Sequence, residues 1–247
     1  MTGRSLLRGL AALGYGVALW QIVVWLTDAP RFILPGPADV AKSLWATRLT
    51  LITHLGFTLV NLVTGLGAGV ILGVATALQL ALSPGARVLV RPMLVFAQAV
   101  PVFALAPVIT LWLGYGAPSK IVMVMLVIYF PVTSTFFDGL MRLPQGHHDL
   151  AQAMGARPWR KLIYLQVPNA LPSLGSGLRL AAVYAPFAVV IGEWVGSSKG
   201  LGYLMLLSNG RGQTDQMFAA LIVLASLSVT LFFIIDSLAK RWSAIST

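Results

Sequence analysis

Long apolar stretches, separated by short polar or glycine- and proline-containing segments, dominate the pattern along the chain. Each stretch is close to the ~20 residues that a helix needs to cross the hydrocarbon core of a bilayer. The pattern therefore predicts an all-α, polytopic membrane protein in which residues 1–247 form a single domain. We expect about six transmembrane helices, near residues 9–27, 57–82, 88–113, 121–137, 169–195 and 217–238.

Two of the expected spans have special features. Glycines spaced four residues apart lie along one side of a helix and allow another backbone to approach closely; in the second span these are Gly65, Gly69 and Gly73. Prolines in a span free backbone carbonyls, which are tolerated only against protein or a water-filled cavity. The third span has three, Pro92, Pro101 and Pro107, which predict a kinked helix, either beside a transport path or for packing alone.

The polar connections differ in character. Leu34-Pro35-Gly36-Pro37 predicts a turn, because neither proline fits a helix interior. Residues 38–53 mix apolar and polar positions, which suits a short helix in the membrane interface or, equally, a solvated loop. Residues 196–213 are rich in glycine and serine and are interpreted as a loop.

A long polar segment, Asp138–Leu171, separates the fourth and fifth spans. Asp149 suits a helix N-terminus, where a carboxylate accepts free N–H groups and complements the dipole. Gly155 and Pro158 then break this short helix, and a second piece is expected over residues 159–166. Pro168 fits the first turn of the fifth span. A connection this elaborate exceeds what joining two spans requires.

Composition supports a membrane protein and sets its orientation. Residues are 57% hydrophobic and 10% charged, and the mean hydropathy is +0.85; soluble domains carry about 25% charged residues. The net charge of +10 fits basic loops facing anionic lipid, so no nucleic-acid partner is inferred. With both termini in the cytoplasm, eleven Lys and Arg residues lie inside and six outside. This orientation places the polar segment in the cytoplasm.

Ionisable and polar residues within spans are functional candidates because burying them in the membrane is costly. Arg179 should face the bundle, with Asp138 or Asp236 as its partner, although Asp236 could instead pair with Lys240 one turn later. Three residues are candidates for the transport path or, alternatively, buried groups satisfied by neighbouring helices: Gln98, Tyr184 and Glu193. Glu193 could line an outer gate or anchor the interface.

Other function classes lack their sequence features. Ser176 lies between glycines, but the histidines, His54, His147 and His148, are in or near loops, and no expected span supplies one as a base. We therefore expect neither catalytic residues nor a metal site. A secondary transporter would usually contain inverted repeats, and none is evident. No phosphate-binding Gly-x-x-x-x-Gly-Lys loop occurs, so the chain does not hydrolyse ATP itself.

The polar segment resembles the cytoplasmic motif of permease subunits of bacterial ATP-binding-cassette (ABC) importers. That motif reads Glu-Ala-Ala, three residues, Gly, nine residues, Ile, one residue, Leu-Pro. Here the matching positions are Asp149, Leu150, Ala151, Gly155, Leu165, Val167 and Pro168. The spacing is retained throughout, and the one departure in size is Leu150 in place of a small alanine.

Further motifs resemble the nitrate, sulfonate and taurine branch of that family. They are residues 34–37 with Val40, residues 104–107 with 111–114, and Gly177-Leu178-Arg179. Residues 193–203, Glu-Trp-Val-Gly-Ser-Ser-Lys-Gly-Leu-Gly-Tyr, look most like branch members that import thiamine-precursor pyrimidines. The resemblance thus implies a pyrimidine substrate, with sulfonate, taurine or nitrate as alternatives.

The resemblance also implies a fold, partners and location. It implies the type I importer permease fold in the bacterial inner membrane. Two permeases, most simply identical, would pair and dock two cytoplasmic ATPases, which bind ATP and Mg²⁺; this chain itself holds no cofactor. A coupling segment, residues 138–168, would insert its short helix into each ATPase through Asp149, Leu150, Ala151, Gly155, Pro158 and Pro168. An external binding protein would deliver the substrate.

Overall fold

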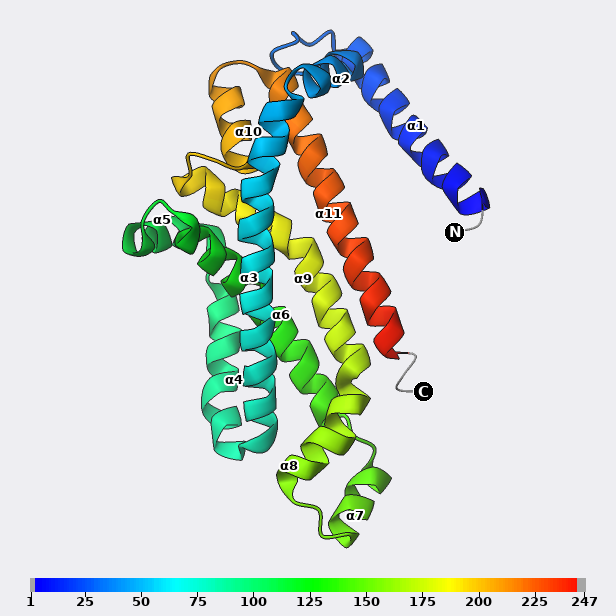
Figure 1. The fold of residues 1–247 in the computed structure, drawn as a ribbon, viewed down its shortest axis with the longest axis vertical. Coiled ribbons are helices and arrows are strands. Elements are labelled where there is room, and N and C mark those ends of the chain that lie inside the picture. Colours follow the sequence, from blue (N-terminus) through cyan, green and yellow to red (C-terminus); the bar gives the residue numbers. More distant parts are fainter. Residues whose placement is uncertain (1–2, 244–247) are drawn as a thin grey trace.

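The computed structural model describes residues 3–243, and all regular secondary structure in that range is helical. The helices follow one another along the chain and are joined by short turns (Figure 1). They are α1 (Gly3–Thr27), α2 (Pro37–Ala46), α3 (Arg48–Leu82), α4 (Pro84–Ala99), α5 (Val102–Leu113), α6 (Ala117–Met141), α7 (Gln145–Ala153), α8 (Pro158–Lys161), the π-helical turn η1 (Leu162–Gln166), α9 (Val167–Gly196), α10 (Leu201–Gly210) and α11 (Thr214–Ser243).

Within the described residues, four helices are long and apolar enough to cross a membrane: Arg48–Leu82, Ala117–Met141, Pro158–Gly196 and Thr214–Arg241. Two shorter apolar helices, Ala11–Thr27 and Val102–Leu113, belong to the first and third expected spans. In Figure 1, α2 and α10 lie at one end of the bundle, and α7 and α8 lie at the other. We refer to these as the α2 end and the α7 end. The expected all-α, polytopic architecture is confirmed.

The core is built where α3, α6 and α9 pack together. The glycine-lined side of α3 lies directly on α6, as its spacing predicts. A Cβ at Gly65 would lie 2.6 Å from Val124 Cβ, and one at Gly69 would lie 3.1 Å from the Met125 carbonyl oxygen. The absence of side chains therefore lets the two backbones approach closely, and Leu62, Val124 and Ile128 fill the adjacent core.

The third expected span is not one kinked helix, and that prediction is wrong. α4 ends at Ala99, Val100 is extended, and α5 begins after Pro101. Proline has no N–H to continue the α4 ladder, and it disfavours helical geometry at the residue before it. The span is thus two half-helices: α4 runs back beside α3 as a hairpin, and α5 points away from it (Figure 1).

The outer connections contain more helix than expected. Residues 37–46 form the short helix α2, so the interfacial-helix alternative is correct there, and α3 begins at Arg48 rather than near Phe57. His54 therefore lies inside α3, not in a loop. The glycine- and serine-rich segment also contains the helix α10, which was not expected; its Leu201 and Leu204 are buried against α2 and α11.

Candidate coupling segment and transport path

The coupling segment begins with α7, whose start differs from the prediction. α7 begins at Gln145, after Pro144, and no side chain caps it. Asp149 is the fifth residue of the helix and is exposed, so the expectation that it lies at the helix N-terminus is wrong. Proline fixes its own φ near the helical value and starts a helix readily. Here Pro144 sets the start one turn earlier than a carboxylate cap would.

Gly155 ends α7 in a Schellman motif. Its φ of +64° is left-handed, its N–H donates to the Gln152 carbonyl (3.0 Å), and the Ala156 N–H donates to the Ala151 carbonyl (2.9 Å). These two bonds satisfy carbonyls at the helix C-terminus that would otherwise lack donors. A Cβ at Gly155 would meet nothing within 4 Å, so glycine is required here by backbone conformation and not by crowding.

After the turn, the chain forms one long helix from Pro158 to Gly196. The expected separate piece at residues 159–166 is instead α8 followed by η1, and it runs directly into α9. Pro168 therefore does not open a new helix. It follows the wide π-helical turn, in which the Val167 N–H reaches the Leu162 carbonyl. We attribute this turn to Pro168, which cannot donate to the carbonyl four residues earlier and would clash with it in a regular α-helix.

The coupling segment presents large apolar side chains to the surroundings at the α7 end. Leu150 and Met154 on α7 are 59% and 76% exposed, while Ala151 is buried. Trp159 on α8 and Ile163 on η1 are also exposed. An unsatisfied apolar patch on a segment rich in polar residues is typical of a protein interaction site.

An ion-pair cluster joins α9 to α11 inside the bundle. Arg179 Nε lies 2.7 Å from Asp236 Oδ1, and Lys240 Nζ lies 2.6 Å from Asp236 Oδ2. Both partners considered for Asp236 are therefore engaged at once. Asp138, the other candidate for Arg179, instead lies 4.0 Å from Arg91 on α4, so that alternative is wrong.

Glu193 is buried at the α2 end, where it holds the start of α10. Thr58 Oγ1 donates to one carboxylate oxygen (2.8 Å), and the Gly202 N–H donates to the other (2.7 Å). The Leu201 N–H donates to Thr58 Oγ1 (2.8 Å), and the Gly200 N–H donates to His54 Nδ1 (3.0 Å). Three consecutive amides at the α10 N-terminus are thus satisfied by side chains from α3 and α9, which stabilises the helix start.

Lys120 completes this cluster from α6. Its side chain is 1% exposed, and its ammonium group donates to the Gly196 carbonyl, the Tyr115 carbonyl (3.1 Å) and Ser119 Oγ (3.1 Å). A cation at the last turn of α9 complements the helix dipole. Its charge also attracts that of Glu193. In this conformation Glu193 is an internal anchor of the α9–α10 connection and does not face an open path.

A hollow of about 580 Å³ opens at mid-bundle between the α4–α5 break, α6 and α9; we call it the mid-span hollow. Three aromatic residues line it, Tyr129, Phe130 and Tyr184, together with Ser134, Thr135 and aliphatic side chains. Of the three path candidates, Tyr184 therefore lies on a cavity. Gln98 is in α4, but its side chain is outside the part of the chain that the structure describes.

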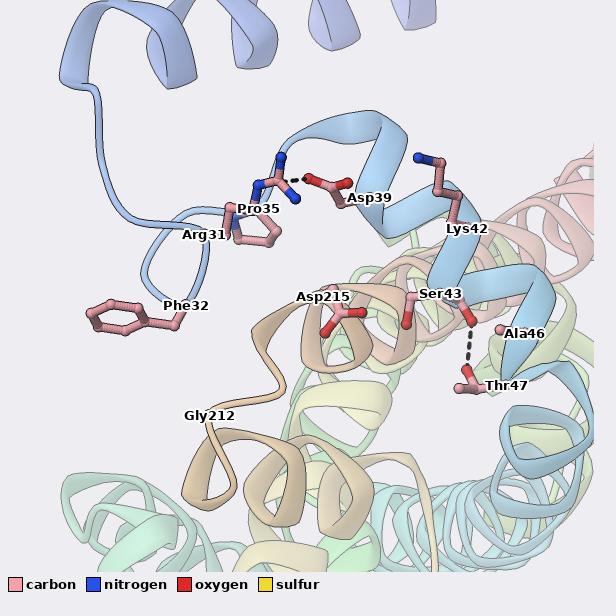
Figure 2. A pocket seen from close by; sticks show the side chains of 10 residues that line it. All are labelled: Arg31, Phe32, Pro35, Asp39, Lys42, Ser43, Ala46, Thr47, Gly212 and Asp215. Atoms are coloured by element: carbon pink, nitrogen blue, oxygen red, sulfur yellow. Dashed lines mark hydrogen bonds and ion pairs between the residues drawn. The ribbon is translucent and has the colours of Figure 1, made fainter.

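A second cavity, of about 610 Å³, lies at the α2 end (Figure 2). The α1–α2 loop, α2 and the start of α11 surround it. Arg31 and Lys42 supply positive charge, and Asp39 and Asp215 supply negative charge. Arg31 Nε is 3.9 Å from Asp39 Oδ2 and its side chain is 89% exposed, so this pair contributes little stability. The cavity is a polar, open surface suited to contact with another molecule.

A model of one protein family matches residues 65–244, which include the coupling segment, the mid-span hollow and α9 to α11. That family is described as the binding-protein-dependent transport system inner membrane component. The chain belongs to this family. The permease is therefore a multi-pass inner-membrane component of a transport system and not an enzyme.

Individual relatives agree with the assignment. The permease is 46% identical to a "Probable ABC transporter permease protein" of Haemophilus influenzae, over 96% of this chain and 98% of the relative. It is 33% identical to the formylaminopyrimidine transport permease protein of Halalkalibacterium halodurans, over 90% and 89% of the two chains. A riboflavin transport permease of Chloroflexus aurantiacus and a taurine transport permease of Escherichia coli are 33% and 26% identical.

Among solved structures, the permease resembles a chain of the MetNI methionine ABC transporter in an inward-facing conformation. The TM-score is 0.60 at 20% identity, and the match covers 81% of this permease and 97% of that chain. At this identity the likeness concerns the fold. The expected importer-permease fold is confirmed.

The polar cluster around Glu193 was largely missed by sequence reasoning. His54 and Thr58 are four residues apart and therefore share one side of α3, but the span was expected to begin only at Phe57. Lys120 lies just before the expected fourth span, and it was counted among the six basic residues on the outer side of the membrane. A lysine beside so apolar a segment was a signal for a buried partner.

Proposed function

We propose that this permease pairs with a second copy, docks two cytoplasmic ABC ATPases through α7, and imports a thiamine-precursor pyrimidine delivered by an external binding protein. ATP and Mg²⁺ bind in the ATPases. The α7 end then faces the cytoplasm, together with both termini, and the α2 end faces outward. The polar cavity at the α2 end is the proposed contact surface for the binding protein.

The coupling segment carries this proposal. α7 is short, is terminated by a bonded Schellman turn, and exposes Leu150 and Met154. The chain then enters a single helix that extends from Pro158 to Gly196. A displacement of α7 by a docked ATPase would therefore be transmitted along α9 to the rest of the bundle. A stand-alone carrier, which docks no ATPase, would not need a short helix with exposed apolar side chains such as Leu150 and Met154.

The substrate assignment is supported by the relatives. The permeases named for formylaminopyrimidine and riboflavin, both planar nitrogen heterocycles, are each 33% identical to this chain, and the one named for taurine is 26% identical. Sulfonate or taurine import is the alternative. Residues 193–203, whose sequence resembles the pyrimidine-importing members, comprise the end of α9, the hydrogen-bonded connection and the start of α10.

ATP hydrolysis by the reconstituted complex tests the proposal. The permease is assembled with its ATPase and binding protein in lipid nanodiscs, and hydroxymethylpyrimidine, taurine and nitrate are added separately. We expect the pyrimidine-loaded binding protein to stimulate hydrolysis most. Stimulation by taurine alone would replace the substrate assignment, and the absence of a co-purifying ATPase would refute the coupling role.

Gly155→Val tests the coupling segment directly. A β-branched residue in the left-handed region costs about 1–2 kcal/mol, which would distort the end of α7 without any clash, because a Cβ there meets open space. We expect uptake to fall by about tenfold while insertion into the membrane is retained. Gly155→Asn is the matched control, since asparagine tolerates this conformation. Normal uptake by the valine variant would contradict docking through α7.

A further inference from the structure

We propose that the mid-span hollow is a substrate site of the permease itself, which takes a neutral, planar, aromatic nitrogen heterocycle through Tyr184 and Ser134. The inference rests on the proposed transport function but goes beyond it, because it places part of the specificity in the membrane subunit and not only in the binding protein.

The position of the hollow fits a site along a transport path. Its lining residues on α6 lie between Leu126 and Thr135, near the middle of a helix that runs from Ala117 to Met141. On α9 they are Leu180 and Tyr184, also near the middle of their helix. The hollow adjoins the break between α4 and α5, and sites in transporters are commonly formed where helices are discontinuous near the bilayer midplane.

The charge of the lining selects a neutral occupant. Among the described residues that line the hollow there is no Lys, Arg, His, Asp or Glu. A sulfonate or nitrate would lose its hydration there without gaining a cationic partner, which is strongly unfavourable in an apolar environment. The ion pair of Arg179 with Asp236 is already internally matched, and neither residue lines the hollow.

The shape of the lining selects a flat aromatic ring. Tyr129 is fixed by its hydroxyl group, which donates to Thr76 Oγ1 on α3 (3.2 Å), so its ring is a rigid wall. Phe130 and the half-exposed Tyr184 add two more aromatic faces. The volume of about 580 Å³ is within the 300–1,000 Å³ range of small-molecule sites. Aromatic walls favour a planar ligand because offset stacking maximises their contact.

Two hydroxyl groups remain to recognise the polar edge of such a ring. Thr135 Oγ1 already donates to the Pro131 carbonyl (2.6 Å). Ser134 Oγ and the Tyr184 hydroxyl have no hydrogen-bond partner within residues 3–243 as the structure describes them. A hydroxyl both donates and accepts, so the pair can match ring nitrogens and exocyclic amino or hydroxyl groups. A small number of polar groups in an otherwise apolar cavity is typical of ligand sites.

Direct binding to the permease–ATPase complex in nanodiscs, without the binding protein, tests the inference. The probe is tritiated hydroxymethylpyrimidine, with tritiated taurine as the charged comparison. We expect saturable binding of the pyrimidine and none of taurine. Tyr184→Leu should raise the Kd by roughly 5- to 100-fold, the range for loss of one aromatic stacking partner. Tyr184→Phe and Ser134→Ala should each raise it by about tenfold or less.

Val183→Leu is the matched control, because Val183 is an exposed neighbour on α9 that does not line the hollow, and it should bind as wild type. Only variants whose complex has the same thermal stability as the wild-type complex are compared. Unchanged pyrimidine affinity in Tyr184→Leu, or equal binding of taurine, would overturn the inference. An absence of pyrimidine binding would also overturn the inference; this result would be found if lipid or a second copy of the permease filled the hollow. Stimulation of ATP hydrolysis by the loaded binding protein in that same complex would leave the proposed function standing.

Discussion

Replacing Gly200 with alanine should destabilise the α2 end far more than a methyl group ordinarily does. Gly200 has φ +112° and ψ 163°, a conformation that is essentially restricted to glycine. An alanine Cβ would also collide with the carboxylate group of Glu193. The carboxylate would have to move away from at least one of its two donors, the Thr58 hydroxyl and the Gly202 N–H.

The two costs can be separated. The backbone conformation alone costs about 1–3 kcal/mol for a non-glycine residue. Loss of one hydrogen bond to a charged, buried group adds about 1.5–3 kcal/mol. We therefore expect Gly200→Ala to lower the free energy of unfolding by about 4 kcal/mol. Gly212→Ala is the comparison without a clash, since Gly212 also has a positive φ (+68°), in the milder left-handed range, and a Cβ there meets nothing within 4 Å. That variant should lose only about 1–2 kcal/mol.

Equilibrium unfolding of the purified permease in mixed micelles measures both variants. The difference between them, about 2 kcal/mol, reports the displacement of Glu193 together with the stricter backbone requirement at Gly200. Glu193→Gln serves as a third comparison, because it retains the shape of the side chain while removing its charge. Equal destabilisation by Gly200→Ala and Gly212→Ala would refute the conclusion that the Glu193 cluster holds the start of α10.

Two further predictions concern the packing of the bundle. In a double-mutant cycle, Arg179→Gln and Asp236→Asn should be coupled, so that the double variant is less destabilised than the sum of the two single variants. Lys240 reduces this coupling because it retains a contact with Asp236. Additive changes in the free energy of unfolding would exclude the pair. Gly69→Leu should prevent close packing of α3 on α6 and cost at least about 2–3 kcal/mol, whereas Gly67→Leu, with open space at its Cβ, should be nearly neutral, as measured by the same unfolding assay.

Most of the bundle can be predicted from the sequence because a membrane span is marked by a local feature, a long run of apolar residues. Twenty apolar residues form a helix in a membrane regardless of what they contact, since every backbone group must be hydrogen-bonded internally. The contact surface of α3 was predictable for a similar reason: Gly65, Gly69 and Gly73 need only helical periodicity to fall on one side. The need of Arg179 for a carboxylate partner followed from the cost of a buried charge, but the choice between Asp138 and Asp236 did not.

The parts that were missed depend on long-range contacts. Gly200 starts a helix because Thr58 and Glu193, distant in sequence, satisfy its first amides, and no local pattern encodes that arrangement. Pro92 and Pro107 lie inside helices whereas the chain breaks at Pro101, so the presence of a proline alone does not predict where a span is interrupted. The start of α7 was misplaced because Asp149 suits an N-terminal cap by residue type, whereas the helix begins earlier, after Pro144.

The continuity of the helix from Pro158 to Gly196 makes it a lever. Beyond the bend at η1, the 30 residues of α9 extend roughly 45 Å at 1.5 Å per residue, as far as the cluster around Glu193 (Figure 1). A tilt of about 5° at Val167 would carry Gly196 through roughly 4 Å, more than the length of any hydrogen bond that Lys120 or Thr58 makes there. Small angular movements at one membrane surface are thereby amplified into the making and breaking of individual contacts at the other.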